Sequence, residues 1–135
     1  MFESITIIGA GGRAGQAIAA RLRERGISLP SEGGELVLLC VPDRAIAEVA
    51  EAIEPGPWIA HVSGATPLRA LDPHERRFSV HPLQTLVTWR GPEQLDGAHA
   101  AVTAESGIPE VSICVRAMWV AKSRSPSVNH DGPAP

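Results

Sequence analysis

A chain of 135 residues is long enough for one domain with a hydrophobic core but too short for two domains of ordinary size. Its composition, 44% apolar and 20% charged with a formal net charge of −3, is typical of a soluble globular protein. The 12 Lys and Arg residues are outnumbered by 15 acids, so we do not expect nucleic acid to be a partner.

The chain enters an apolar strand pattern at Ile5, without a basic leader, and no apolar run approaches the about 18 residues that a membrane helix needs. We therefore expect a cytoplasmic protein that does not contact a membrane. Cys40 and Cys114 lie far apart in apolar stretches and have no metal-ligating neighbours at close spacing. This pattern favours two reduced thiols in the core over a disulfide or a nucleophile, and it predicts no metal site.

The first structural unit is predicted to be a strand, a glycine-rich turn and a helix. A β-branched run over 4–8 ends at Gly9, and apolar residues then recur at every fourth position from Ala14 to Leu22. Gly26 is a natural end for that helix. Its polar faces are expected to carry the charged residues Arg21, Arg23, Glu24 and Arg25.

Strands and helices continue to alternate along the chain. The apolar run 36–41 predicts a strand buried on both faces, Asp43 is a candidate N-cap for the next helix, and 58–62 predicts another strand. Shorter elements are expected over 68–71, 78–80 and 100–102. This alternation predicts an α/β fold with a doubly wound, mostly parallel Rossmann-type sheet.

Two segments depart from a complete fold of this kind. Residues 26–35 leave room for a brief strand over 27–29 but not for a strand and a helix, so the sheet should be abbreviated after the first βα unit. The apolar periodicity fades after residue 105. We therefore expect a domain over 1–105, an irregular or disordered tail over 106–135, and no C-terminal helical domain, as in a truncated or frame-disturbed gene product.

The glycine-rich turn is the strongest candidate for a binding site. Gly9, Gly11 and Gly15 form the spacing G-x-G-x-x-x-G, and Ala10 with Gly12 begins an overlapping A-x-G-x-x-G. Either spacing lets the backbone approach a pyrophosphate closely and present the N–H groups of a helix N-terminus. Its place between a strand and an amphipathic helix predicts dinucleotide binding. The alternative is a turn whose glycines serve only helix packing.

Two charged residues near this turn are ambiguous. An acid about 20 positions beyond the glycines holds the adenosine ribose in NAD-type sites, and Glu32 follows Gly11 by 21 positions. Glu32 precedes two glycines instead of a helix, which favours a surface carboxylate. Arg13 is either a phosphate contact or a solvated charge at the helix start.

Polar groups also follow the later predicted strands, where ligands bind in such sheets. Ser63 and Gly64 could hold a substrate carboxylate or the nicotinamide amide, or could simply form a turn. His81, fixed by the proline after it, could polarise a carbonyl or move the proton that accompanies hydride transfer. Gln84 adds an amide close behind. The remaining candidates, His74 and His99, are expected at the surface.

Four motifs in order resemble one known family: G-A-G from Gly9, L-V-L-L-C-V-P-D ending at Asp43, H-V-S-G-A from His61, and H-P-L-Q-T from His81. They resemble the bacterial Rossmann-like oxidoreductases that carry an extra C-terminal domain of unknown function. That family belongs to a wider group of 6-phosphogluconate-dehydrogenase-like and deazaflavin-dependent NADP oxidoreductase-like proteins. The resemblance covers about residues 4–105.

The resemblance implies a nicotinamide cofactor, NADP or NAD, on residues 9–15. Val41, Pro42 and Asp43 would line its nicotinamide side, while Ser63, Gly64, His81 and Gln84 would face the substrate. It further implies hydride transfer to or from a small hydroxy, keto or imino acid, and a homodimer in full-length relatives. Two alternatives remain: a nucleotide-binding module or gene remnant without turnover, and a prephenate-type dehydrogenase, for which Arg90 is the candidate carboxylate ligand.

Overall fold

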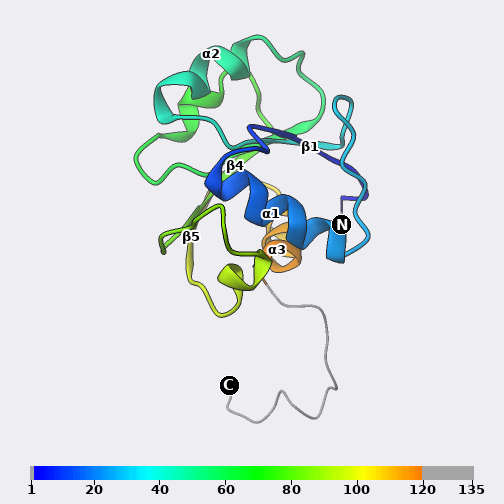
Figure 1. Ribbon diagram of the computed structural model, residues 1–135. Helices are drawn as coiled ribbons and strands as arrows, with labels where there is room; N and C mark the ends of the chain where they lie inside the picture. Colours follow the sequence, from blue (N-terminus) through cyan, green and yellow to red (C-terminus); the bar gives the residue numbers. More distant parts are fainter. Residues whose placement is uncertain (1, 120–135) are drawn as a thin grey trace.

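The computed structural model describes residues 2–119 and contains one five-stranded sheet between helices (Figure 1). The expected disorder of residues 120–135 lies outside the described residues. In chain order the elements are β1 (Ile5–Ile8), α1 (Arg13–Glu24), β2 (Leu36–Leu39), a 3-10 helix (Asp43–Ala45) leading into α2 (Ile46–Glu51), β3 (Trp58–His61), a 3-10 helix (Leu68–Leu71), β4 (Arg77–Pro82), a 3-10 helix (Pro92–Leu95), β5 (Ala100–Ala104) and α3 (Ile108–Trp119).

The strands lie side by side in the order in which the chain makes them, β1-β2-β3-β4-β5. The first four are parallel, and β5 runs antiparallel to β4 along the edge. This arrangement confirms the predicted α/β fold with a mostly parallel sheet. Because parallel strands end at the same edge, the loops that follow β1, β2, β3 and β4 are neighbours in that order.

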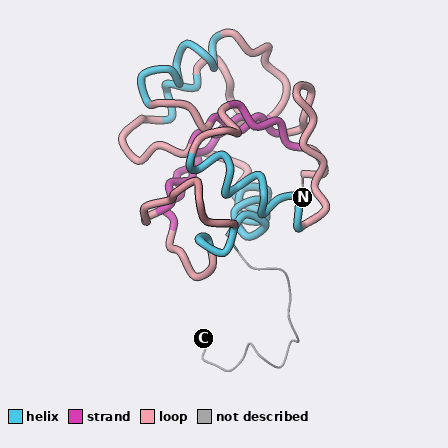
Figure 2. Tube along the Cα trace, in the orientation of Figure 1, coloured by secondary structure: helices cyan, strands magenta, loops and turns pink. Residues whose placement is uncertain are grey.

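Helices cover both faces of the sheet, with α2 on one face and α1 and α3 on the other (Figures 1 and 2). The side chains of β2 alternate between the two layers: Leu36 and Leu38 pack with the α1 and α3 core, whereas Val37 and Leu39 pack with the α2 core. All four are buried, as expected for a parallel strand between helices. Each such side chain contributes about 1.5–3 kcal/mol through burial.

The sheet is abbreviated where the sequence predicts it. On the free side of β1 the chain makes a single bridge, in which Ser28 donates to the Glu3 carbonyl (3.0 Å) and Ile5 donates to the Ser28 carbonyl (2.9 Å). The next hydrogen bond of a parallel ladder would need the backbone N–H of residue 30. That residue is Pro30, which has no N–H, so the pairing ends after one bridge.

The predicted irregular tail is wrong over 108–119, which form α3. Val111, Cys114 and Met118 follow the i, i+3, i+7 spacing of one helical face, and all three are buried in the core beside α1. Pro109 stands in the first turn, where a proline is compatible with a helix. The segment contains a helical pattern that becomes stable by packing against α1.

The expected exposure of Arg21 is also wrong, because this side chain is only 1% exposed. The 3-10 helix Pro92–Leu95 packs against this face of α1. The Arg21 guanidinium donates to the Pro92 carbonyl (2.8 Å) and pairs with the Asp96 carboxylate. A charged residue is therefore the tie between α1 and the segment that leads into β5.

Two smaller expectations also need correction. Asp43 is not an N-cap, because it is the first residue of the 3-10 helix and Pro42 stands at the N-cap position. His74 is buried, and its Nε2 donates to the carbonyl of Ala50 (2.9 Å), which ties the loop before β4 to α2. His99 is exposed, as expected.

Within residues 2–119, no helix has the length and apolar character needed to cross a bilayer.

We expect Arg21→Leu to lower the free energy of unfolding by about 1–3 kcal/mol, because the Pro92 carbonyl and the Asp96 carboxylate lose a buried charged donor. The matched control is Arg23→Leu on the exposed face of the same helix, which should change stability by less than about 0.5 kcal/mol. Urea denaturation followed by circular dichroism measures both. Equal effects of the two substitutions would contradict a stabilising role for the bonds of Arg21 to Pro92 and Asp96.

Candidate functional site

The candidate site is the edge of the sheet at which β1 to β4 end. The glycine-rich turn follows β1, Val41 to Asp43 follow β2, Ser63 and Gly64 follow β3, and His81 lies at the end of β4. Neighbouring strands are about 4.8 Å apart, so these four breaks form a row about 14 Å long. The strand order thus brings together the motifs that the sequence separates by up to about 70 residues.

Two glycines of the turn are required by close backbone packing. Gly9 has a φ of +91°, and a Cβ there would lie 2.3 Å from the carbonyl oxygen of Cys40. A Cβ on Gly15 would lie 2.1 Å from the carbonyl oxygen of Gly9. Both distances are far below van der Waals contact, so α1 can start directly on the end of β1 only with glycine at these positions. For Gly9 and Gly15, the packing explanation is sufficient.

Gly11 differs, because a Cβ there would meet no atom within 4 Å. Of the residues that the structure describes, none caps the N-terminus of α1 at Gly12 with its side chain, and the first turn of the helix contains no acid. The first N–H groups of the helix are therefore open to an anion. Arg13, the first residue of α1, is exposed and has no ion pair or hydrogen bond to the described residues. Together these groups suit the pyrophosphate of a dinucleotide.

The loop after β2 lies directly beside the glycine turn. Val41 is half-buried, and its Cγ1 is 3.4 Å from the position that a Cβ on Gly9 would take. Pro42 and Asp43 are exposed at the same edge. The structure thus places Val41 next to the turn, and Pro42 and Asp43 follow it in the loop after β2.

Gly64 and His81, predicted from separate motifs, are in contact. A Cβ on Gly64 would lie 2.6 Å from Cδ2 of the His81 ring, so this glycine is needed to accommodate the imidazole. Nδ1 of His81 lies 3.1 Å from the carbonyl oxygen of Val62. Because a carbonyl can only accept, Nδ1 carries the proton, and Nε2 has the free lone pair. His81 is therefore held in the tautomer that can take a proton at Nε2.

The hydroxyl of Ser63 is used inside its own loop. Its Oγ lies 2.8 Å from the hydroxyl of Thr66 and accepts a hydrogen bond from the Ala65 N–H (3.2 Å). These are the bonds of a serine-stabilised turn. The geometry favours the simple-turn alternative for Ser63, which shapes the loop on which Gly64 lies.

His61 is a site residue to which the sequence reasoning gave no role. It is fully buried, and its Nδ1 accepts a hydrogen bond from the Ser63 N–H (3.0 Å). Burial lowers the pKa of His61, although the carbonyls of Pro67 and Thr66 and the charge of Asp43 act in the opposite direction. His61 is thus held neutral, with its proton on Nε2. It anchors the loop that supports His81.

The loop after β4 is organised by a second residue that the sequence reasoning missed. The buried side chain of Gln94 accepts from the Val87 N–H (2.8 Å) and donates to the carbonyls of Val87, Arg90 and Gly91 at 3.0–3.1 Å. The Gln84 amide nitrogen donates to the backbone carbonyl of Gln94. The side chain of Gln84, which is predicted to contact the substrate, is therefore exposed but bound within its own loop.

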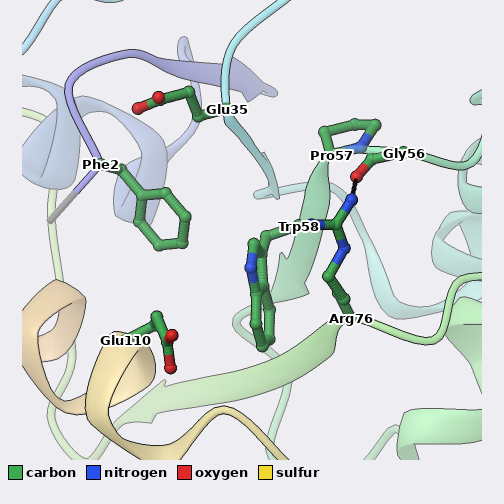
Figure 3. Close-up of a pocket in the computed structure, with 7 residues that line it drawn as sticks. All are labelled: Phe2, Glu35, Gly56, Pro57, Trp58, Arg76 and Glu110. Carbon is green, nitrogen blue, oxygen red and sulfur yellow. Dashed lines mark hydrogen bonds between the residues drawn. The ribbon is translucent and has the colours of Figure 1, made fainter.

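A hollow of about 380 Å³ lies at the opposite edge of the sheet (Figure 3). Trp58, at the start of β3, lines it together with Phe2, Arg76, and the carboxylates of Glu35 and Glu110. Two carboxylates would repel the phosphates of a dinucleotide. Arg76 offsets only one of them, so the lining keeps a net negative charge that does not suit the same ligand. The hollow is separate from the glycine turn because it lies where the strands begin.

The two cysteines fit the structural role predicted for them. Both are free thiols, and burial raises the pKa of Cys40 and of Cys114 to about 12. A thiol with such a pKa has almost no nucleophilic thiolate near neutral pH. Within residues 2–119, no group of three or more His, Cys, Asp or Glu side chains is arranged to hold a metal ion.

No family model and no curated protein matches this sequence. Among solved structures, the chain is similar to a "putative NADP oxidoreductase" from Bacteroides fragilis, with 16% sequence identity and a TM-score of 0.58. The alignment covers 86% of this chain and 57% of that chain. At this identity the likeness shows the fold alone, a Rossmann-like α/β sheet. The chain spans little more than half the length of the protein that it matches.

Because burial holds the pKa of His61 below its value of about 6.5 in an unfolded chain, the unfolded state binds a proton more readily. The contribution of neutral His61 to stability is therefore complete above about pH 6.5 and is lost as the pH falls toward the folded-state pKa. His61→Asn keeps an acceptor near the Nδ1 position but cannot titrate. We expect the free energy of unfolding to fall more steeply from pH 7.5 to about 5.5 in the wild type than in the variant.

Urea denaturation at several pH values measures this difference. His61→Asn is expected to lower stability at pH 7.5, because the smaller side chain leaves a cavity, so only the slopes are compared. Parallel slopes in the two proteins would contradict a buried, neutral His61.

Proposed function

We propose that this chain binds a nicotinamide dinucleotide, NADP or NAD, on residues 9–15 and serves hydride transfer to or from a small hydroxy, keto or imino acid. The observation that carries the proposal is the position of Gly11. Gly9 and Gly15 are explained by packing, but the space in front of Gly11 is open and lies beside an uncapped helix start. A glycine that packing does not require suits close approach of a ligand.

The cofactor would be held by groups that have no other partner within the described part of the chain, residues 2–119. The first N–H groups of α1 and the Arg13 guanidinium would bind the pyrophosphate. Val41, Pro42 and Asp43 would line the nicotinamide side, because they are next in the row of strand ends. When bound, the nicotinamide supplies the hydride donor or acceptor.

His81 is the proposed catalytic residue. The Val62 carbonyl fixes the proton on Nδ1, so Nε2 can accept the proton of a substrate hydroxyl during oxidation and return it during reduction. Ser63 and Gly64 would act by shaping the loop against which the imidazole rests. Gln84, on the loop after β4, would reach the substrate only after its bond to the Gln94 carbonyl is released.

The second candidate function is a nucleotide-binding module without turnover. The bonds that Ser63 and Gln84 make within their own loops favour it, because they leave His81 with fewer neighbours free to bind a substrate. We also propose a binding domain over 1–105 with a following segment, and a homodimer in full-length relatives. A prephenate-type dehydrogenase is not favoured, since Arg90 is exposed and pairs with Glu93 (3.7 Å).

Cofactor binding is tested with Gly11→Val and Arg13→Gln. Because a Cβ at Gly11 meets no atom within 4 Å, the valine should leave the fold unchanged but block the phosphate position, so we expect no measurable binding of NADPH or NADH. Arg13→Gln should weaken both by about three- to tenfold, as expected for loss of one exposed phosphate contact.

The matched control is Arg23→Gln, which removes an exposed charge at the other end of α1 and should leave both affinities unchanged. Isothermal calorimetry measures affinity, and thermal unfolding checks that each variant folds. If neither NADPH nor NADH binds the wild type, both candidate functions are wrong.

Turnover is tested with His81→Asn, which can keep the donor to the Val62 carbonyl but has no group at the Nε2 position. We expect it to bind the cofactor as the wild type does and to lower kcat for reduction of small keto acids by about 100-fold or more. Loss of reduced-nicotinamide absorbance measures the rate. A wild type that binds cofactor but reduces no acid in the panel would favour the module without turnover.

A further inference from the structure

The free side of β1 shows which half of a dinucleotide this chain can recognise. In the complete fold a second strand runs along that side, and its end carries the group that contacts the adenosine ribose. Here the pairing stops at Ser28, because Pro30 cannot donate the next hydrogen bond. Beyond Ile5, no strand of residues 2–119 pairs with this side, and Ile7 and Ile8 are only partly buried.

The chain between α1 and β2 remains at the amino-terminal end of the sheet. Ser28 pairs with Ser4, just before β1, and Glu35 donates to the carbonyl of Ser4 (3.0 Å). Figure 1 shows this loop at the end of β1 where the strand begins, with the glycine turn at the other end. A strand of four residues separates the two by about 13 Å.

Glu32 therefore has the sequence spacing of a ribose-binding acid but not its position. It is an exposed residue of this amino-terminal loop, in agreement with the surface carboxylate that the following glycines favour. Asp43 belongs to the opposite side of the turn, after β2. Neither carboxylate lies where the end of a second strand would place one.

On the basis of the proposed function, we infer that the site recognises the nicotinamide and pyrophosphate of the cofactor and does not recognise its adenosine. Among residues 2–119, no side chain on the free side of β1 is placed to hold ribose hydroxyls, which favours NAD in other sites, or to bind a 2′-phosphate, which favours NADP. The site thus neither selects nor rejects the 2′-phosphate. Its ligand class is a reduced or oxidised nicotinamide nucleotide with at least one phosphate.

The test measures the Kd values of NADH, NADPH and reduced nicotinamide mononucleotide for the full chain by calorimetry. The mononucleotide lacks the adenosine and one of the two phosphates, and the loss of one exposed phosphate contact should by itself weaken binding by no more than about tenfold. We expect all three Kd values to agree within about tenfold, a difference of about 1.4 kcal/mol. A dinucleotide that binds more than tenfold tighter than the other two ligands, or two dinucleotides that both exceed the mononucleotide by that factor, would overturn the inference and leave the proposed function intact.

Glu32→Gln provides the second arm of the test. It should leave the Kd of NADH unchanged within about twofold, whereas Arg13→Gln should weaken all three ligands by the same factor. If Glu32→Gln weakens NADH but not the mononucleotide, the carboxylate reaches the ribose and the inference is wrong. If none of the three ligands binds the wild type at about 5 mM, the proposed function itself is wrong.

Discussion

The close approach of backbone to backbone at the glycine turn is the constraint on which the rest of the molecule depends. Gly9 lies against the carbonyl of Cys40, and Gly15 lies against the carbonyl of Gly9. These two contacts set α1 directly on the end of β1 and hold β1 beside β2. The buried side of α1 then packs on the sheet, and Arg21 and Arg25 extend that packing to the Pro92–Leu95 helix and to α3.

A second arrangement follows from the consecutive strand order. Because β1, β2, β3 and β4 are adjacent and parallel, each strand end adds its own polar group to one edge. The groups that follow β3 and end β4 hold one another in place. Buried His61 accepts a hydrogen bond from the Ser63 N–H, and the turn formed by Ser63 positions Gly64. Gly64 in turn leaves room for the His81 ring. The imidazole is positioned by packing and backbone bonds instead of by another charge, so its tautomer is fixed without an acidic partner.

Local patterns were enough to predict the strands, α1, the glycine turn and the row of strand ends. Periodicity and glycine spacing depend on neighbouring residues, and those survive in any tertiary context. Arg21, His74 and Gln94 could not be placed, because their burial depends on segments that are distant in sequence. The helix α3 is different. Its apolar residues were visible, but they are not confined to one face, since Ile108 and Ile113 are exposed, so the helical period is weak until α1 provides the surface that α3 covers.

The strand that would pair with the free side of β1 is reduced to the single bridge at Ser28. Its loss affects only one part of the row of strand ends that forms the candidate site. Removing pairing from the free side of β1 leaves both faces of the sheet intact, since Ile5 and the side chains of β2 remain buried between helices. The exposed edge is only a few residues long, which limits the pairing it offers to other chains. Pro30 therefore removes one boundary of the proposed dinucleotide site with little effect on the core. The residues of the proposed nicotinamide side are unaffected, because they depend on β2, β3 and β4.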